Sequence, residues 1–308
     1  MAGVHLAPEI GLGWDGKHRV FAGADVMREW GSSQTIDFYD PVIYYEYAGE
    51  PFRFYAGAIP RRMILDRYPR MFFSDSILNY RPVVNGVFWE YTAPAGSYAN
   101  VWLDWTGRQT HTRHEAFFMG WSGRYNRGIF RLQHFGYMFH FAPVKDPEVY
   151  VPVHDNGLTL TSIGVDVAHK AGFDKLETNL GWAIALDRDR EIGVWNTPQG
   201  ILSETTVEYR GLELFNTYYK GGRQQVYYNE FGNNLYWGDP VYRSNEYDRL
   251  DLSIHFMKTG IVDLKFTYSL HFTENSIYHQ QAFYATVNLS NLDKEKKKKK
   301  KYRYLWGY

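Results

Sequence analysis

The fold is decided by residues 250–273, which read LDLSIHFMKTGIVDLKFTYSLHFT. Apolar and polar side chains alternate with a period of two in both halves of this stretch, and the short loop 259–261 separates the halves. Successive side chains of a β-strand point to opposite faces, so each half predicts a strand with one oily and one polar face. The stretch as a whole therefore predicts a β-hairpin.

The register of this hairpin follows from its pattern, because the apolar sets of two paired strands must lie on one face. The expected pairs are Phe256 with Leu264, Ile254 with Phe266, Leu252 with Tyr268, Leu250 with Leu270 and, on the polar face, His255 with Lys265 and Asp251 with Ser269. The same reasoning around the turn 93–96 pairs Tyr91 with Ala99, Trp89 with Val101, Val87 with Leu103 and Glu90 with Asn100.

The alternation recurs along almost the whole chain, and helical periodicity is nearly absent. Most of the predicted strands are 10–15 residues long, near the roughly 9–11 residues that cross a bilayer at a tilt. Strands are expected near 4–14, 17–29, 36–48, 51–60, 83–94, 97–107, 113–122, 127–141, 158–169, 173–187, 203–217, 223–230, 247–258, 261–273 and 279–290.

The composition excludes several classes of function. The 308 residues carry 34 Lys and Arg against 34 Asp and Glu, so the chain lacks the basic excess of a protein that binds nucleic acid. Cysteine is absent, which rules out disulfides, thiolate metal sites and cysteine catalysis. No apolar run is long enough for a membrane-spanning helix, and the N-terminus has no signal-peptide pattern. We expect no cofactor and no bound metal.

Tight and long connections alternate along the chain. Tight turns are predicted at 15–16, 49–50, 94–96, 122–128, 170–172, 221–222 and 259–260, and the longest loops at 61–82, 142–157, 188–202 and 231–246. An up-and-down meander with short turns at one end and long loops at the other is typical of outer-membrane barrels.

These strands and loops, together with aromatic residues near strand ends such as Trp14, Trp30, Trp105 and Trp121, resemble the porin-like β-barrels of the Gram-negative outer membrane. The resemblance covers the whole chain and rests on architecture, without a family-specific motif. It implies an all-β, antiparallel, up-and-down transmembrane β-barrel of about 14–16 strands in the bacterial outer membrane. The partners would be membrane lipid and small polar solutes, and an oligomer is compatible with this fold.

We expect residues 1–290 to form the barrel, 291–301 a Lys-rich turn or tail, and 302–308 the strand that closes against residues 4–14. In the competing account, the barrel ends at the strand 279–290 and the remainder is a solvated basic tail.

Polar faces would line the lumen if the oily faces contact lipid. The expected lumen-facing residues are Asp104, Arg131, Gln133, Glu177, Asn179, Asp251, His255, Asp263, Lys265 and His271. The loop 61–82 resembles the porin loop that folds inward and narrows the pore, and its charged residues Arg61, Arg62, Asp66, Arg67 and Arg70 would form the constriction.

Three catalytic or metal-binding patterns carry little weight. Asp251, Ser253 and His255 share one strand face, but alternate residues lie roughly 6–7 Å apart, too far for a direct Ser–His hydrogen bond. His111 and His114 lack an evident third metal ligand. The loop carboxylates match no template for calcium binding or glycoside hydrolysis: Asp187, Asp189, Glu191, Asp239, Glu246 and Asp248.

The sequence therefore predicts a pore for passive diffusion of small polar solutes rather than an enzyme. Two alternatives stay open. One is a soluble, aromatic-rich protein that binds or processes glycans. The other is a barrel that carries an embedded hydrolase or anchors partners through its outer loops.

Overall fold

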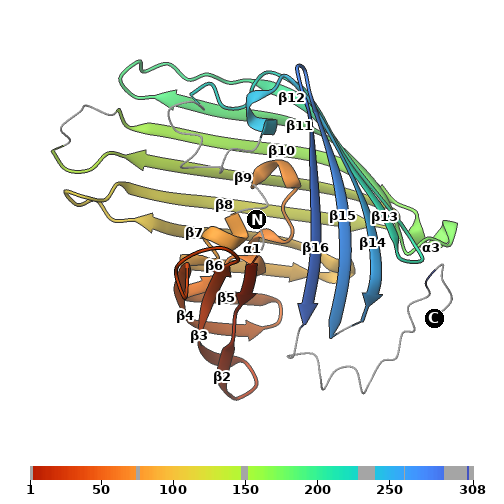
Figure 1. The fold of residues 1–308 in the computed structure, drawn as a ribbon, viewed down its shortest axis with the longest axis horizontal. Helices are drawn as coiled ribbons and strands as arrows, with labels where there is room; N and C mark the ends of the chain where they lie inside the picture. Colours follow the sequence, from red (N-terminus) through yellow and green to blue (C-terminus); the bar gives the residue numbers. More distant parts are fainter. Residues whose placement is uncertain are drawn as a thin grey trace.

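The computed structural model describes residues 3–73, 77–146, 152–227, 240–259, 261–287 and 304. These residues form one antiparallel sheet of 16 strands in which, from β2 onward, neighbours along the chain pair with one another (Figure 1). The strands are β1 (Gly3–Leu6), β2 (Glu9–Trp14), β3 (His18–Glu29), β4 (Phe38–Gly49), β5 (Phe52–Pro60), β6 (Val83–Ala93), β7 (Ser97–Gly107), β8 (Glu115–Arg127), β9 (Phe130–Ala142), β10 (His154–Asp166), β11 (Lys175–Asp189), β12 (Gln199–Tyr209), β13 (Leu212–Gly221), β14 (Glu246–Lys258), β15 (Val262–Thr273) and β16 (Ile277–Val287).

The helices are single turns in the connections. They are α1 (Arg62–Leu65), η1 (Arg70–Phe72), α2 (Ile77–Tyr80), η2 (Pro94–Gly96), α3 (Ala168–Ala171) and η3 (Pro240–Arg243). Among the described residues, no helix is both long enough and apolar enough to cross a membrane.

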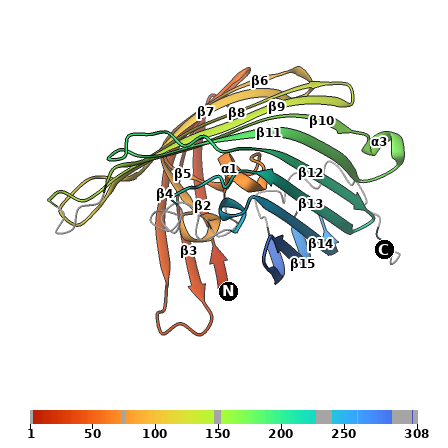
Figure 2. The same ribbon diagram turned by 90° about the horizontal axis from the view of Figure 1, so that it is seen from above.

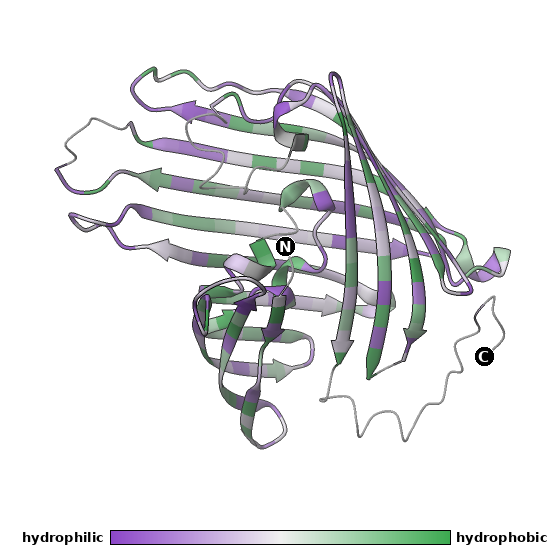
Figure 3. Ribbon diagram, viewed as in Figure 1, coloured by the Kyte–Doolittle hydropathy of each residue, from purple (hydrophilic) through white to green (hydrophobic). Residues whose placement is uncertain are grey.

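Burial along the strands is the reverse of that in a soluble protein. On β14, Asp251, Ser253 and His255 are each 3% exposed, whereas Leu252 and Phe256 are 43% and 51% exposed. Polar side chains therefore point inward and apolar ones outward, and the alternation is visible as stripes of colour in Figure 3. A β-sandwich would bury its apolar faces between the sheets, so this pattern fits a lipid-facing barrel.

Figure 2 shows the sheet curved around a central segment, and the predicted antiparallel, up-and-down barrel of about 14–16 strands is confirmed. Strands β1 and β2 both pair with β3 and are separated at Pro8, which cannot donate a ladder hydrogen bond. No pairing joins β16 to β1 or β2 within the described part of the chain. The predicted tail 291–301 and closing strand 302–308 lie outside the described residues, apart from Tyr304.

The predicted registers hold with one exception. The 93–96 hairpin pairs as expected, and so do Leu252 with Tyr268, Ile254 with Phe266 and His255 with Lys265. The predicted pair of Phe256 with Leu264 is wrong, because a bulge between His255 and Met257 brings Met257 opposite Leu264. A bulge adds one residue to one strand, which an alternating pattern does not reveal.

A second correction concerns the predicted strands 203–217 and 223–230 and the predicted tight turn at 221–222. The chain instead turns at Arg210 and Gly211, whose φ angles are 49° and 89°, between β12 and β13. Two successive residues with positive φ give the hairpin turn that matches strand twist. Arginine rarely adopts this conformation, so the residue pair gave a weak turn signal.

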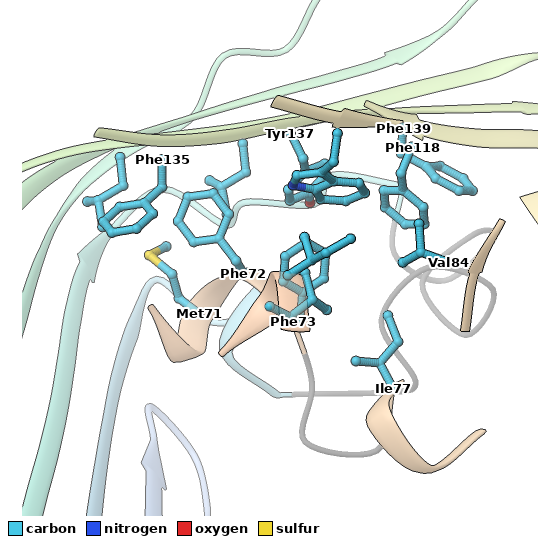
Figure 4. Packing of buried hydrophobic residues seen from close by; sticks show 14 of the residues in the cluster. Met71, Phe72, Phe73, Ile77, Val84, Phe118, Phe135, Tyr137 and Phe139 are labelled. Carbon is cyan, nitrogen blue, oxygen red and sulfur yellow. The ribbon is translucent and has the colours of Figure 1, made fainter. Parts of the chain in front are cut away.

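The described residues of the segment 61–82, which are 61–73 and 77–82 and are called here the inserted segment, lie inside the curved sheet. Its Met71, Phe72, Phe73 and Ile77 are buried. Figure 4 shows Met71, Phe72 and Phe73 packed against aromatic side chains of the barrel wall, including Phe118, Phe135 and Tyr137, with Ile77 below Val84. The barrel is thus partly filled by an apolar cluster on one side of its interior.

Candidate functional site

Arginine–carboxylate pairs fix the inserted segment to the barrel wall. Arg61 pairs with Asp104 on β7 at 2.5 Å, and Arg67 pairs with Glu90 on β6. Arg70 pairs with Asp251 on β14, far along the sheet from β6 and β7. The inserted segment therefore reaches across the lumen, as the predicted inward fold of this loop requires.

A cavity of about 740 Å³ lies between the inserted segment and the inner faces of the strands β8 to β13 and β15. The predicted constriction and lumen residues that line it are Asp66, Arg67, Arg70, Arg131, Gln133, Glu177, Asn179 and Lys265. We call this space the luminal cavity.

The other predicted residues lie elsewhere in the barrel interior. Arg61 and Asp104 are 1% and 0% exposed. They form a buried ion pair that anchors the inserted segment, and they do not line the luminal cavity. Arg62 is half exposed and pairs with Glu9 of β2. Asp251 is held by Arg70 and Arg249 and lies outside the cavity lining.

His255 and Asp263 hydrogen-bond at 3.0 Å near the turn that joins β14 and β15. The Ser253 hydroxyl bonds Thr267 at 2.8 Å, and no Ser253–His255 bond is found among the described residues. This agrees with the expectation that their spacing on one strand is too wide. His111 lies 3.8 Å from Asp146, both exposed, and no cluster of three metal-ligating side chains occurs in the described part of the chain.

The outer surface carries a second polar site, which the sequence reasoning missed. His140 on β9 and Asp155 on β10 are directly opposite each other, and His140 Nδ1 lies 2.9 Å from Asp155 Oδ1. They share the face of Met138 and Ile163, which are 42% and 66% exposed and face lipid. A histidine–aspartate pair therefore lies on the lipid-facing side of the barrel.

Two arginines complete this cluster. Arg188 on β11 donates to Asp155 at 2.8 Å, and Arg190 donates to both oxygens of the same carboxylate at 2.7 and 3.0 Å. Trp195 covers the Arg188 guanidinium at 4.4 Å. Hydrogen bonding to Asp155 raises the pKa of Arg190, which lies just beyond the end of β11. We call His140, Asp155, Arg188 and Arg190 the rim cluster.

The rim cluster lies at the long-loop end of the barrel, because β9 ends at Ala142, β10 begins at His154 and β11 ends at Asp189. A row of aromatic rings extends from the rim cluster across the neighbouring strands β8 and β7. The His140 ring contacts Phe117 on β8 with centroids 5.0 Å apart, and Phe117 stacks on Trp105 of β7 at 5.4 Å. Aromatic rings of this kind favour the level of the lipid headgroups.

The geometry of the pair suits proton transfer. With Nδ1–H donating to Asp155, the imidazole Nε2 carries a lone pair and can accept a proton. No hydrogen bond to Nε2 of His140 is found among the described residues, so that nitrogen is available to a reactant. The two guanidinium groups can stabilise negative charge nearby.

A sequence signal for this site existed. His140 falls on the oily face of its predicted strand, at even positions together with Leu132 and Met138, and a charged or titratable group on a lipid-facing position is unusual. The sequence predicts Asp155 in the loop 142–157, and this prediction is wrong, because β10 begins at His154. The error hid the pairing of the two residues.

Comparison with solved structures places the fold among outer-membrane barrels. The match to the anion-selective porin from Comamonas acidovorans covers 90% of this chain and 83% of the porin chain, with 11% identity and a TM-score of 0.55. OccAB4 from Acinetobacter baumannii matches 91% and 88%, with 10% identity and a TM-score of 0.43. No curated protein sequence matches the chain.

The sequence family gives a different indication of function. The family described as lipid A 3'-O-deacylase-type matches residues 1–295. The prediction that the protein is not an enzyme is therefore wrong, because a deacylase family is defined by a reaction. Strand alternation could not predict enzyme activity, because it indicates the fold and not the chemistry of individual side chains. The chain belongs to the lipid A 3'-O-deacylase-type family.

Proposed function

We propose that the protein is an outer-membrane acyl-ester hydrolase that removes an ester-linked acyl chain from lipid A, and that the rim cluster is its active site. The observation that carries the proposal is a hydrogen-bonded His140–Asp155 pair on the lipid-facing surface, flanked by Arg188 and Arg190. The family match supplies the reaction class. In outer-membrane barrels the long loops face the outside of the cell. The outer leaflet, which holds lipid A, lies on that side.

In the proposed reaction, His140 Nε2 accepts a proton from water as the water oxygen attacks the ester carbonyl carbon. Asp155 holds the imidazole and stabilises the imidazolium that forms. Arg188 and Arg190 stabilise the oxyanion of the tetrahedral intermediate. When the ester C–O bond breaks, His140 returns the proton to the sugar oxygen, which yields a free fatty acid and a sugar hydroxyl.

The position of the rim cluster favours it over the histidine inside the barrel. His255 is 3% exposed within the lumen and is held by Asp263 and by a more distant Glu213 carboxylate. A lipid headgroup in the membrane plane reaches the outer face of the wall without entering the lumen. His140 and Arg190 are on that face, so an acyl chain can stay in the bilayer while its ester meets the cluster.

The test is release of fatty acid from purified lipid A by the folded barrel in detergent micelles, followed by mass spectrometry. His140→Gln is expected to lower the rate by roughly 10²–10⁴-fold, since a general base contributes that much. His255→Gln is the matched control and keeps the rate of the parent protein. Full activity of a folded His140→Gln barrel would refute the site, and no release by the parent protein would refute the function.

A second candidate function is passage of small polar solutes through the lumen. The luminal cavity favours it, because charged and amide side chains line a space of about 740 Å³ behind the inserted segment. Single-channel conductance in a planar bilayer tests it. Discrete steps would support passage past the inserted segment, and a silent bilayer with confirmed insertion would argue against it.

A further inference from the structure

The luminal cavity has the size and lining of a ligand-binding site. Residues 65–70, 73, 77 and 78 of the inserted segment form one wall, and the inner faces of β8 to β13 together with Lys265 of β15 form the other. Its volume of about 740 Å³ lies within the roughly 300–1,000 Å³ typical of small-molecule sites. The rim cluster lies on the opposite, lipid-facing side of the wall, so this cavity has no part in the proposed hydrolysis.

Five of the nine charged side chains that line the cavity have an ion-pair partner among the described residues. The other four are two carboxyl groups, Asp66 and Glu204, and two cations, Arg124 and Lys265, so the charges of the site balance once the partners are counted. Arg131 pairs with Glu177 at 2.5 Å and Asp166 at 2.9 Å, and Lys175 pairs with the same Glu177 at 2.9 Å. Arg67 and Arg70 pair with carboxylates of the wall. An ionic ligand at the paired groups would have to displace these partners, and breaking a buried ion pair is costly.

The paired groups keep unused hydrogen-bonding capacity. A guanidinium has five N–H donors and a carboxylate about four acceptor positions, so one ion pair leaves donors and acceptors for hydroxyl groups. Amides add to this set. In the orientation that satisfies its neighbours, Gln133 donates to Asn179 at 2.8 Å and accepts from Arg124 Nε at 3.1 Å. Arg124 has no carboxylate partner among the described residues.

Aromatic surface lies beside these polar groups. Phe215 on β13 lines the cavity and holds the Arg70 guanidinium over its ring at 5.2 Å. Tyr68 of the inserted segment also lines the cavity and accepts a hydrogen bond from Trp102 at 2.9 Å. Charge-balanced donors and acceptors beside an aromatic surface match a ligand with many hydroxyls and apolar C–H faces.

We propose that the luminal cavity binds a neutral carbohydrate of one or two sugar rings. The hydroxyl groups of the sugar bond the arginine, carboxylate and amide groups of the wall, and one ring face packs near Phe215. The inserted segment supplies Arg67, Tyr68 and Arg70 to the site, so the site exists only with that segment folded inside the barrel.

The test is equilibrium dialysis of the full-length barrel, folded in a detergent without a sugar headgroup, against radiolabelled glucose, sucrose, lactose and maltose. Inorganic phosphate and acetate serve as charged probes. Saturable binding of at least one neutral sugar, with weaker binding of both anions, is expected. Absence of saturable binding for every sugar, or tighter binding of phosphate than of any sugar, would overturn the proposal.

Two variants locate the site. Arg124→Gln and Phe215→Leu are each expected to weaken sugar binding by roughly tenfold, the equivalent of one good polar or ring contact. Arg127→Gln is the matched control, because Arg127 lies on the same strand as Arg124 but outside the cavity lining. Sugar binding unchanged in both cavity variants would place the sugar elsewhere and contradict the assignment. Lipid deacylation is measured separately, so the two proposals fail independently.

Discussion

The buried pair of Arg61 and Asp104 gives the sharpest prediction for how the inserted segment is held. Arg61 Nη2 lies 2.5 Å from Asp104 Oδ2, and the two side chains are 1% and 0% exposed. Arg61 also donates to the carbonyl oxygens of Arg81 and Val83. Asp104 accepts the backbone N–H of Asn85 at 2.9 Å. The pair thus joins both ends of the inserted segment to β7.

Asp104→Ala leaves a buried guanidinium charge without its carboxylate and the Asn85 N–H without its acceptor. Breaking such a pair costs about 3–5 kcal/mol, so we expect the free energy of unfolding to fall by at least about 3 kcal/mol. The assay is reversible urea unfolding in lipid vesicles, followed by tryptophan fluorescence.

Arg62→Ala is the matched control for this loss. Arg62 is the next residue, but its side chain is 50% exposed in its pair with Glu9, so about 0–1 kcal/mol is expected. The double variant Arg61→Met with Asp104→Leu should recover most of the loss, since no charge is left unpaired. If Asp104→Ala costs no more than Arg62→Ala, the pair does not anchor the segment and the reasoning is refuted.

Three further predictions follow from individual positions. A Cβ added at Gly120 would meet the buried Trp102 ring at 2.2 Å, so Gly120→Ala should cost about 1–3 kcal/mol of unfolding free energy in the same assay. Leu252→Arg places a charge on the lipid-facing side of β14 and should cost up to about 2–4 kcal/mol in vesicles. Hydrogen bonds from the Ser32 hydroxyl and the Glu29 backbone lower the pKa of Asp37, so Ser32→Ala should raise that pKa in an NMR titration.

Each of these three predictions has a control variant or a result that would contradict it. Gly123→Ala, on the same strand as Gly120, meets only a backbone oxygen at 3.5 Å and should be nearly neutral. Leu252→Met keeps the apolar face, and an equal loss in the Met and Arg variants would contradict a lipid contact. Because the pKa of Asp37 is lowered, its stabilising contribution is present above its ordinary pKa and is lost as the pH falls through the lowered value. An unshifted pKa in Ser32→Ala would remove the hydroxyl as its cause.

The sequence carried the barrel architecture because strand alternation is a local property. Leu252, Ser253 and Ile254 alternate in the chain and so must alternate between lipid and lumen once the strand forms. Register followed from the same pattern, except at the bulge after His255, where one added residue leaves no trace in composition. The inward position of the inserted segment was implied only by its resemblance to the porin loop that narrows the pore, because strand alternation says nothing about where a loop folds.

The partners of each side chain were decided by the tertiary structure. Arg70 and Asp251 are 181 residues apart, and only the curvature of the sheet around the inserted segment brings them together. His140, Asp155 and Arg188 come from three strands, and their meeting depends on where β10 begins and on the register of two hairpins. Local alternation determines which face a residue occupies, but the neighbour it finds there depends on strand pairing, turn lengths and bulges summed over the sheet. For this reason the sequence alone determined a lipid-facing barrel, and only the folded chain located the rim cluster and the luminal cavity.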